Sequence, residues 1–71
     1  NPTNDNVFIK TNKNFGQVTM TLTDLNGRQV YSKRVDLFGE IEINMNSFQS
    51  GIYILNIKGE FINSNDKIIK N

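Results

Sequence analysis

Three acidic residues, Asp36, Glu40 and Glu42, could bind a hard cation or serve as an acid and base pair. Glu40 and Glu42 are two positions apart, so a strand would place both on one face. No further acidic cluster or acceptor group accompanies them. A solvated strand face is therefore the favoured interpretation, and we expect no catalytic, metal-binding or cofactor-binding residues.

The amino-acid composition excludes most other kinds of catalytic and metal-binding site. The 71 residues include no cysteine and no histidine, which excludes disulfides, thiolate or imidazole metal sites and the common nucleophilic triads. Eight basic and seven acidic residues are spread along the chain and give a net charge of +1, unlike the one-sided charge of nucleic-acid binders. No apolar run approaches the roughly 20 residues of a membrane-spanning helix. We expect one non-enzymatic domain over residues 1–71, with no cofactor, no nucleic-acid partner and no direct membrane insertion.

Alternating apolar residues predict a series of short strands. The clearest is QVTMTLTD, residues 17–24, in which apolar residues alternate with threonines. Pro2 keeps the chain before the first strand extended or turning. Further strands are expected within residues 5–12, 28–34, 40–45, 52–58 and 67–70. The charged and polar residues of the strand expected at 28–34 are typical of an edge strand.

Two turns separate these strands. Asn26 and Gly27 are typical of the two positive-φ positions of a type I′ hairpin turn, and Asp24 is a residue that accepts local backbone hydrogen bonds. Residues 36–39, DLFG, mark another turn. We interpret Asp24 and Gly27 as turn-forming residues before any other role.

The stretch SFQSGIY, residues 47–53, predicts a corner at which the chain crosses from one sheet to another. In Greek-key sandwiches a tyrosine near the start of the penultimate strand donates its hydroxyl to backbone a few residues upstream. Tyr53 fits that role, Gly51 permits a tight backbone before it, and Phe48 would fill the core below. Together with turn signals every 8 to 12 residues, this predicts an all-β fold: a small immunoglobulin-like β-sandwich of about seven antiparallel strands with Greek-key features.

The ordered motifs closely resemble the type A C-terminal sorting domain of the type IX secretion system of Bacteroidota. In that family an opening Pro-Asn-Pro is followed by an Asp-Leu-x-Gly turn, a Leu-x-x-Gly-x-Tyr corner and a Lys-x-x-Lys-like tail. The matching residues are Pro2 with Asn1, Asp24 with Leu25 and Gly27, Gly51 with Tyr53, and Lys67 with Lys70. Phe48 replaces the usual aliphatic residue of the corner, a substitution that conserves the core.

The resemblance implies a transport signal at the end of a longer secreted protein. Cargo carrying such a domain enters the periplasm by an N-terminal signal and crosses the outer membrane through a translocon and its shuttle protein, which recognise the folded domain. A surface sortase-like peptidase typically removes the domain, and the cargo is released or attached to lipopolysaccharide. The cargo domain N-terminal to residue 1 would then be the remaining partner.

Residues Lys67, Ile68, Ile69 and Lys70 are the candidates for recognition by the translocon, because they form the last strand and the family-like tail. The alternative is that terminal lysines only keep an edge strand soluble. A second class of function also satisfies the strand pattern: an immunoglobulin-like or fibronectin-like spacer or adhesin module of a cell-surface protein. A spacer would occur internally or in tandem, whereas a sorting domain would occur once, at the C-terminus.

Overall fold

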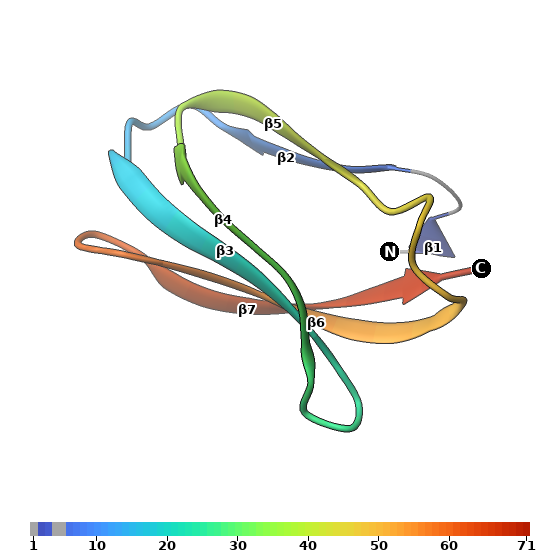
Figure 1. Ribbon diagram of the computed structural model, residues 1–71. Coiled ribbons are helices and arrows are strands. Elements are labelled where there is room, and N and C mark those ends of the chain that lie inside the picture. The colour runs from blue at the N-terminus through green and yellow to red at the C-terminus, as the bar shows by residue number, and fades with distance from the viewer. Residues whose placement is uncertain (1, 4–5) are drawn as a thin grey trace.

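The computed structural model describes Pro2–Thr3 and residues 6–71, and these form strands without any helix (Figure 1). The strands follow the alternation of apolar residues in the sequence. In chain order they are β1 (Pro2–Thr3), β2 (Asn6–Thr11), β3 (Gln17–Asp24), β4 (Gln29–Asp36), β5 (Gly39–Asn44), β6 (Gly51–Gly59) and β7 (Asn63–Lys70).

Two sheets face each other (Figure 1). One has five strands in the order β1-β7-β6-β3-β4, and the other consists of β2 and β5. Six strands pair antiparallel, whereas β1 pairs parallel with β7 through Pro2 and Ile69 and through Thr3 and Lys70. The expectation of about seven antiparallel strands is therefore wrong for β1, a two-residue strand that lies beside the chain end. The all-β class is confirmed, and the immunoglobulin-like assignment stays a prediction.

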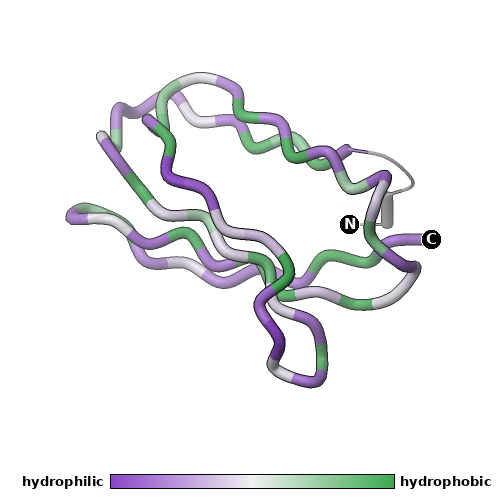
Figure 2. Tube along the Cα trace, viewed as in Figure 1, coloured by the Kyte–Doolittle hydropathy of each residue, from purple (hydrophilic) through white to green (hydrophobic). Residues whose placement is uncertain are grey.

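The core lies between the two sheets and is built from the inward faces of β2 to β7 and from two residues of the connecting loops, Leu37 and Met45. Figure 2 shows apolar and polar residues alternating along the strands, as the sequence predicted. On β6 the buried face carries Tyr53, Leu55 and Ile57, each at most 6% exposed. Among the residues with described side chains, 6–71, the buried ones are Val7, Val18, Met20, Leu22, Leu37, Ile43, Met45, Tyr53, Leu55, Ile57 and Ile68.

The hairpin between β3 and β4 is confirmed, but its predicted type I′ turn is wrong. Gly27 has a φ of 83°, whereas Asn26 does not have a positive φ. The Gly27 amide donates to the Asp24 carbonyl (3.1 Å), and the Asp24 amide donates to the Arg28 carbonyl (2.9 Å). The turn therefore has a single positive-φ residue, the glycine near its end. The Asp24 side chain stabilises this turn by accepting hydrogen bonds from the Asn26 and Arg28 amides.

Strand β4 forms one edge of the large sheet, as predicted, and extends to Asp36. Lys33 lies opposite the buried Met20, so its side chain starts on the inner face, yet it remains exposed. An inward-pointing charge of this kind opposes pairing with another chain.

The 36–39 turn carries the chain to the other sheet, with Leu37 buried and held by hydrogen bonds with Phe15 and Gly16.

The last strand starts earlier than expected. The sequence predicted it near Lys67, but β7 begins at Asn63. Residues 63–66 are polar and have low strand propensity. Their pairing with β6, which starts at Lys58 and Asn63 across a tight hairpin, overrides that propensity. Asp5, which belonged to the predicted first strand, lies outside the described residues.

Gly59, at the end of β6, pairs with Val18 of β3. A Cβ atom there would lie 2.7 Å from Val18 Cγ1 and 3.0 Å from the Gln17 carbonyl oxygen. Val18 is 1% exposed, so it has no free space into which to move. We expect Gly59→Ala to lower the free energy of unfolding by about 1–3 kcal/mol, measured by urea denaturation. Glu60→Ala, at an exposed neighbouring position, is the control. An unchanged midpoint for Gly59→Ala would contradict the close approach.

Candidate functional site

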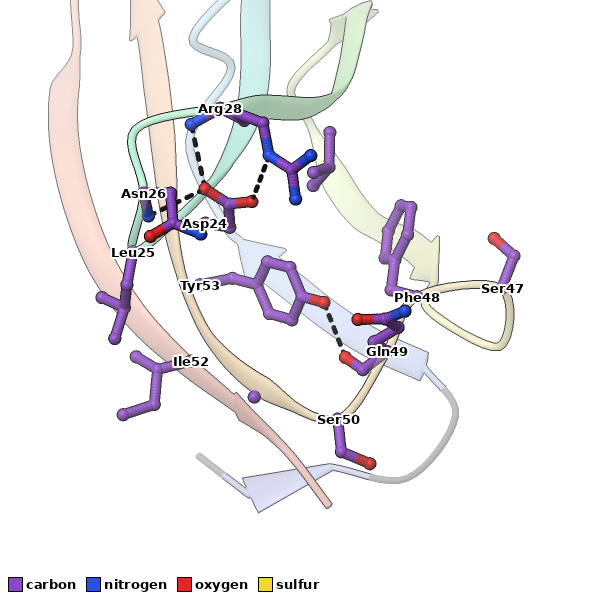
Figure 3. Close-up of a pocket in the computed structure, with 12 residues that line it drawn as sticks. Asp24, Leu25, Asn26, Arg28, Ser47, Phe48, Gln49, Ser50, Ile52 and Tyr53 are labelled. Atoms are coloured by element: carbon purple, nitrogen blue, oxygen red, sulfur yellow. Dashed lines mark hydrogen bonds and ion pairs between the residues drawn. The ribbon is translucent and has the colours of Figure 1, made fainter.

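Two of the sequence motifs meet at one pocket of about 440 Å3 (Figure 3). The hairpin DLNGR, residues 24–28, forms one side and residues 47–53 form the other. The two stretches are far apart in the chain, and the pairing of Asp24 with Tyr53 between β3 and β6 brings them together. The resemblance therefore rests largely on residues that share one region of the folded domain.

Asp24 organises the hairpin side of the pocket. Its Oδ1 accepts hydrogen bonds from the amides of Asn26 (2.9 Å) and Arg28 (2.9 Å), and its Oδ2 pairs with Arg28 Nε (3.1 Å). The bond from the Arg28 amide lowers the pKa of Asp24 most; partial desolvation opposes it, and the Arg28 guanidinium and the Asn26 amide add to the lowering. Asp24 therefore has the turn-forming role expected of it, with its acceptor capacity used within the hairpin.

Tyr53 forms the predicted tyrosine corner. Its hydroxyl donates to the Gln49 carbonyl over 2.6 Å while its ring is 6% exposed (Figure 3). The Phe48 ring lies against Tyr53 with centroids 6.0 Å apart, and against Tyr31 edge-on at 6.3 Å. Gly51 has a φ of 154°, a backbone conformation that side chains with a Cβ rarely adopt. The corner is held by the Tyr53 hydroxyl bond, by the tilted contact with the Phe48 ring and by the permissive backbone of Gly51.

Lys70 ties the last strand to the same corner. Its ammonium donates to the Phe48 carbonyl (2.5 Å) and to the Asn46 carbonyl (3.3 Å). These carbonyls belong to the segment that joins the small sheet to β6, so Lys70 ties the end of β7 to the crossing. This partnership gives Lys70 a structural role, which the sequence did not show.

The four recognition candidates of the last strand fall into different environments. Ile68 is 2% exposed and belongs to the core, so a partner of the folded domain cannot reach it. Ile69 and Lys70 are partly exposed, and Ile69 pairs with Pro2 of β1. Lys67 is exposed, and its side chain makes no hydrogen bond or ion pair to another described residue. Of the four candidates, Lys67 therefore has the side chain that is most accessible to a partner.

The outer face of the large sheet carries two apolar residues that the motif analysis did not single out, Ile52 and Ile54. Ile52 lies beside Ile69, and Ile54 lies beside Lys67, all on the face opposite the core. Leu25, at the tip of the hairpin, is 69% exposed. We call Leu25, Ile52, Ile54, Lys67 and Ile69 the outer patch. Its signal in the sequence was the second row of apolar residues in β6, but periodicity alone did not say whether another element covers that row.

The acidic residues do not form a site. Glu40 lies 3.5 Å from Lys10 across the small sheet, and Glu42 accepts a hydrogen bond from the Asn6 side chain. Among the residues that the structure describes, no group of three or more acidic side chains is placed to hold a metal ion. The part of the chain with described coordinates also has no helix that is both long and apolar enough to cross a membrane.

A protein-family comparison gives the class to which this arrangement belongs. The model of the secretion system C-terminal sorting domain matches residues 1–71. The chain belongs to this family of type IX secretion sorting signals, which is not a catalytic family. No curated protein and no solved structure matches the chain. Membership implies interaction with the type IX secretion machinery and export of a cargo to the cell surface or the medium.

The tyrosine corner is tested by removing one oxygen atom. We expect Tyr53→Phe to lower the free energy of unfolding by about 1–2 kcal/mol, because the Gln49 carbonyl loses its donor while the ring still packs on Phe48. Chemical denaturation monitored by circular dichroism measures the loss. Tyr31→Phe is the matched control, since no hydrogen bond of the Tyr31 hydroxyl is found among the described residues. Equal stability of both variants would contradict the corner.

The lowered pKa of Asp24 predicts a pH dependence. Its carboxyl is more acidic in the folded than in the unfolded protein, so it stabilises the fold above its ordinary pKa, and this contribution disappears as pH falls through the lowered pKa. Asp24→Asn should therefore reduce Tm near neutral pH, and its difference from the wild type should narrow in acid. Thermal melting across this range tests it, with Asp36→Asn as the exposed control. A constant difference at every pH would contradict the expectation.

Proposed function

We propose that this domain is the C-terminal secretion signal of a longer protein and directs that cargo across the outer membrane through the type IX system. The translocon and its shuttle protein recognise the domain in its folded form. The cargo passes through the periplasm, a sortase-like peptidase removes the domain, and the cargo is released or attached at the surface. The family match over residues 1–71 is the observation that carries this proposal.

Recognition of a folded domain is supported by what the motif residues do. Asp24 accepts hydrogen bonds within the hairpin, Tyr53 closes the corner and Lys70 binds the carbonyls of the crossing. The polar groups of these residues are engaged in bonds within the domain. They therefore contribute to transport indirectly, by stabilising the fold that presents the recognised surface. An extended peptide signal would not need these long-range partners.

The outer patch is the surface that we assign to the secretion machinery. It contains the two motif residues that are exposed and lack a structural partner among the described residues, Leu25 and Lys67. Partly exposed isoleucines of β6 and β7 lie between them and add apolar area. A protein partner that covers apolar side chains and pairs a carboxylate with Lys67 would fit this patch.

Export of a passenger tests both the signal and the patch. A fluorescent protein with a periplasmic signal peptide in front and residues 1–71 behind is expressed in a host with a working type IX system, and in the same host without the translocon. We expect the passenger to leave the cell only when the translocon is present. Lys67→Glu should reduce export at least about ten-fold, as for loss of a central interface contact. Lys58→Glu is the matched control, because Lys58 is exposed on the same face at the far end of β6.

The outcomes separate the possible functions. If a folded passenger stays in the periplasm with the translocon present, a second passenger that also carries the cargo residues preceding residue 1 is tested. Retention of both passengers contradicts the sorting function and favours the spacer, whereas export of the longer one alone shows that the upstream residues are required. If export depends on the translocon but Lys67→Glu and Lys58→Glu behave alike, the sorting function holds and the outer patch is the wrong surface.

A further inference from the structure

The pairing of β1 leaves most of the outer edge of β7 open. Pro2 and Thr3 lie beside Ile69 and Lys70, and in the described part of the chain no strand lies beside positions 63–67 on that side. Because β1 and β7 are parallel, the chain that leads into β1 comes from the direction of the open positions. In Figure 1 β1 lies beside the C-terminal end of β7.

A groove runs beside this open edge. It has a volume of about 420 Å3 and lies between β2 of the small sheet and β7 of the large one. Val7, Ile9, Leu55 and Ile68 supply apolar side chains to it, and Asp66 and Lys67 line the β7 side. The other edge of β2 pairs with β5. The groove therefore lies between the free edge of the small sheet, at β2, and the β7 edge of the large sheet.

We propose that the residues immediately before residue 1 continue β1 along β7 and cover this groove. The inference rests on the proposed function, in which a cargo precedes the domain. The register is fixed by Pro2 opposite Ile69: the residue directly before residue 1 lies opposite Lys67, and the second one before it lies opposite Asp66. Five added residues reach Asn63, the first residue of β7.

The chain's own upstream segment is favoured over a foreign strand for two reasons. It is already paired to β7 through β1, so extending the pairing needs no new association and benefits from a high effective concentration. Asp66 lies opposite the buried Leu55, on the inner face of the edge strand, yet is exposed. A charge in this position opposes pairing with separate chains, and it stays hydrated at the mouth of the groove when a tethered strand lies beside it.

Disulfide trapping in the full-length cargo protein tests the register. The 71 residues contain no cysteine, so two are introduced, with any cargo cysteine replaced by serine. One replaces the second residue before residue 1 and the other is Asp66→Cys. Partner residues on neighbouring strands are within disulfide range. We expect this pair to cross-link within one chain at least about ten-fold faster than the same upstream cysteine with Lys67→Cys, whose side chain points to the other face.

Hydrogen exchange gives a second measurement that needs no mutation. In the full-length protein, the alternate amides of residues 63–67 that face away from β6 should exchange at least about ten-fold more slowly than in the chain that starts at residue 1. The amides that face β6 are the internal control and should be unchanged.

Equal cross-linking of both cysteine pairs, cross-links between two chains, or unchanged exchange would overturn the inference. Both measurements use purified folded protein and do not depend on export. A protein that is exported while the edge stays open contradicts this inference alone, and one that is not exported although the edge is covered contradicts only the proposed function.

Discussion

The crossing from the small sheet to β6 depends on the hydrogen bond from the Tyr53 hydroxyl to the Gln49 carbonyl. This bond fixes the place where the chain leaves the small sheet and enters β6, the strand that lies between β3 and β7 in the large sheet. A small domain without disulfides has only one modest core to hold its two sheets together. An error at this crossing would displace β6 and both of its neighbours at once.

The same crossing joins the C-terminus to the rest of the fold. Lys70 donates to carbonyls of the crossing, and Ile68 fills the core beside Tyr53. The last strand is therefore part of the packed domain, although it stands at the end of the chain. A secretion machinery that reads the outer face near this strand reads a surface that exists only when the corner has formed. This dependence is the physical basis of our proposal that the signal is recognised in its folded form.

The sequence predicted the elements that depend on local pattern. The alternation in residues 17–24 and 52–58 gave β3 and β6, and the order of Gly51 and Tyr53 gave the corner. The sequence-based prediction was wrong where contacts between residues far apart in the chain determine the local structure. The polar start of β7 forms a strand because β6 pairs with it, and the turn at Asn26 follows the hydrogen bonds of Asp24.

The candidate site shows the same division. Asp24, Gly51 and Tyr53 were assigned their roles from short motifs, because each acts on backbone within a few residues. The bond of Lys70 to Phe48 spans 22 residues and leaves no local trace. Ile52 and Ile54 were visible as a second apolar row, but only the sheet order shows that no described strand covers this face.

The central claim is that the corner serves transport by holding the fold, while the outer patch makes the contact. Export of a passenger carrying Tyr53→Phe tests it most directly, at a temperature where circular dichroism shows the variant domain to be fully folded. The account predicts export equal to that of the wild type under this condition, with a loss only when the temperature is raised enough to unfold the domain. A folded Tyr53→Phe domain that fails to export its passenger would show that the corner itself is recognised, and would contradict the account.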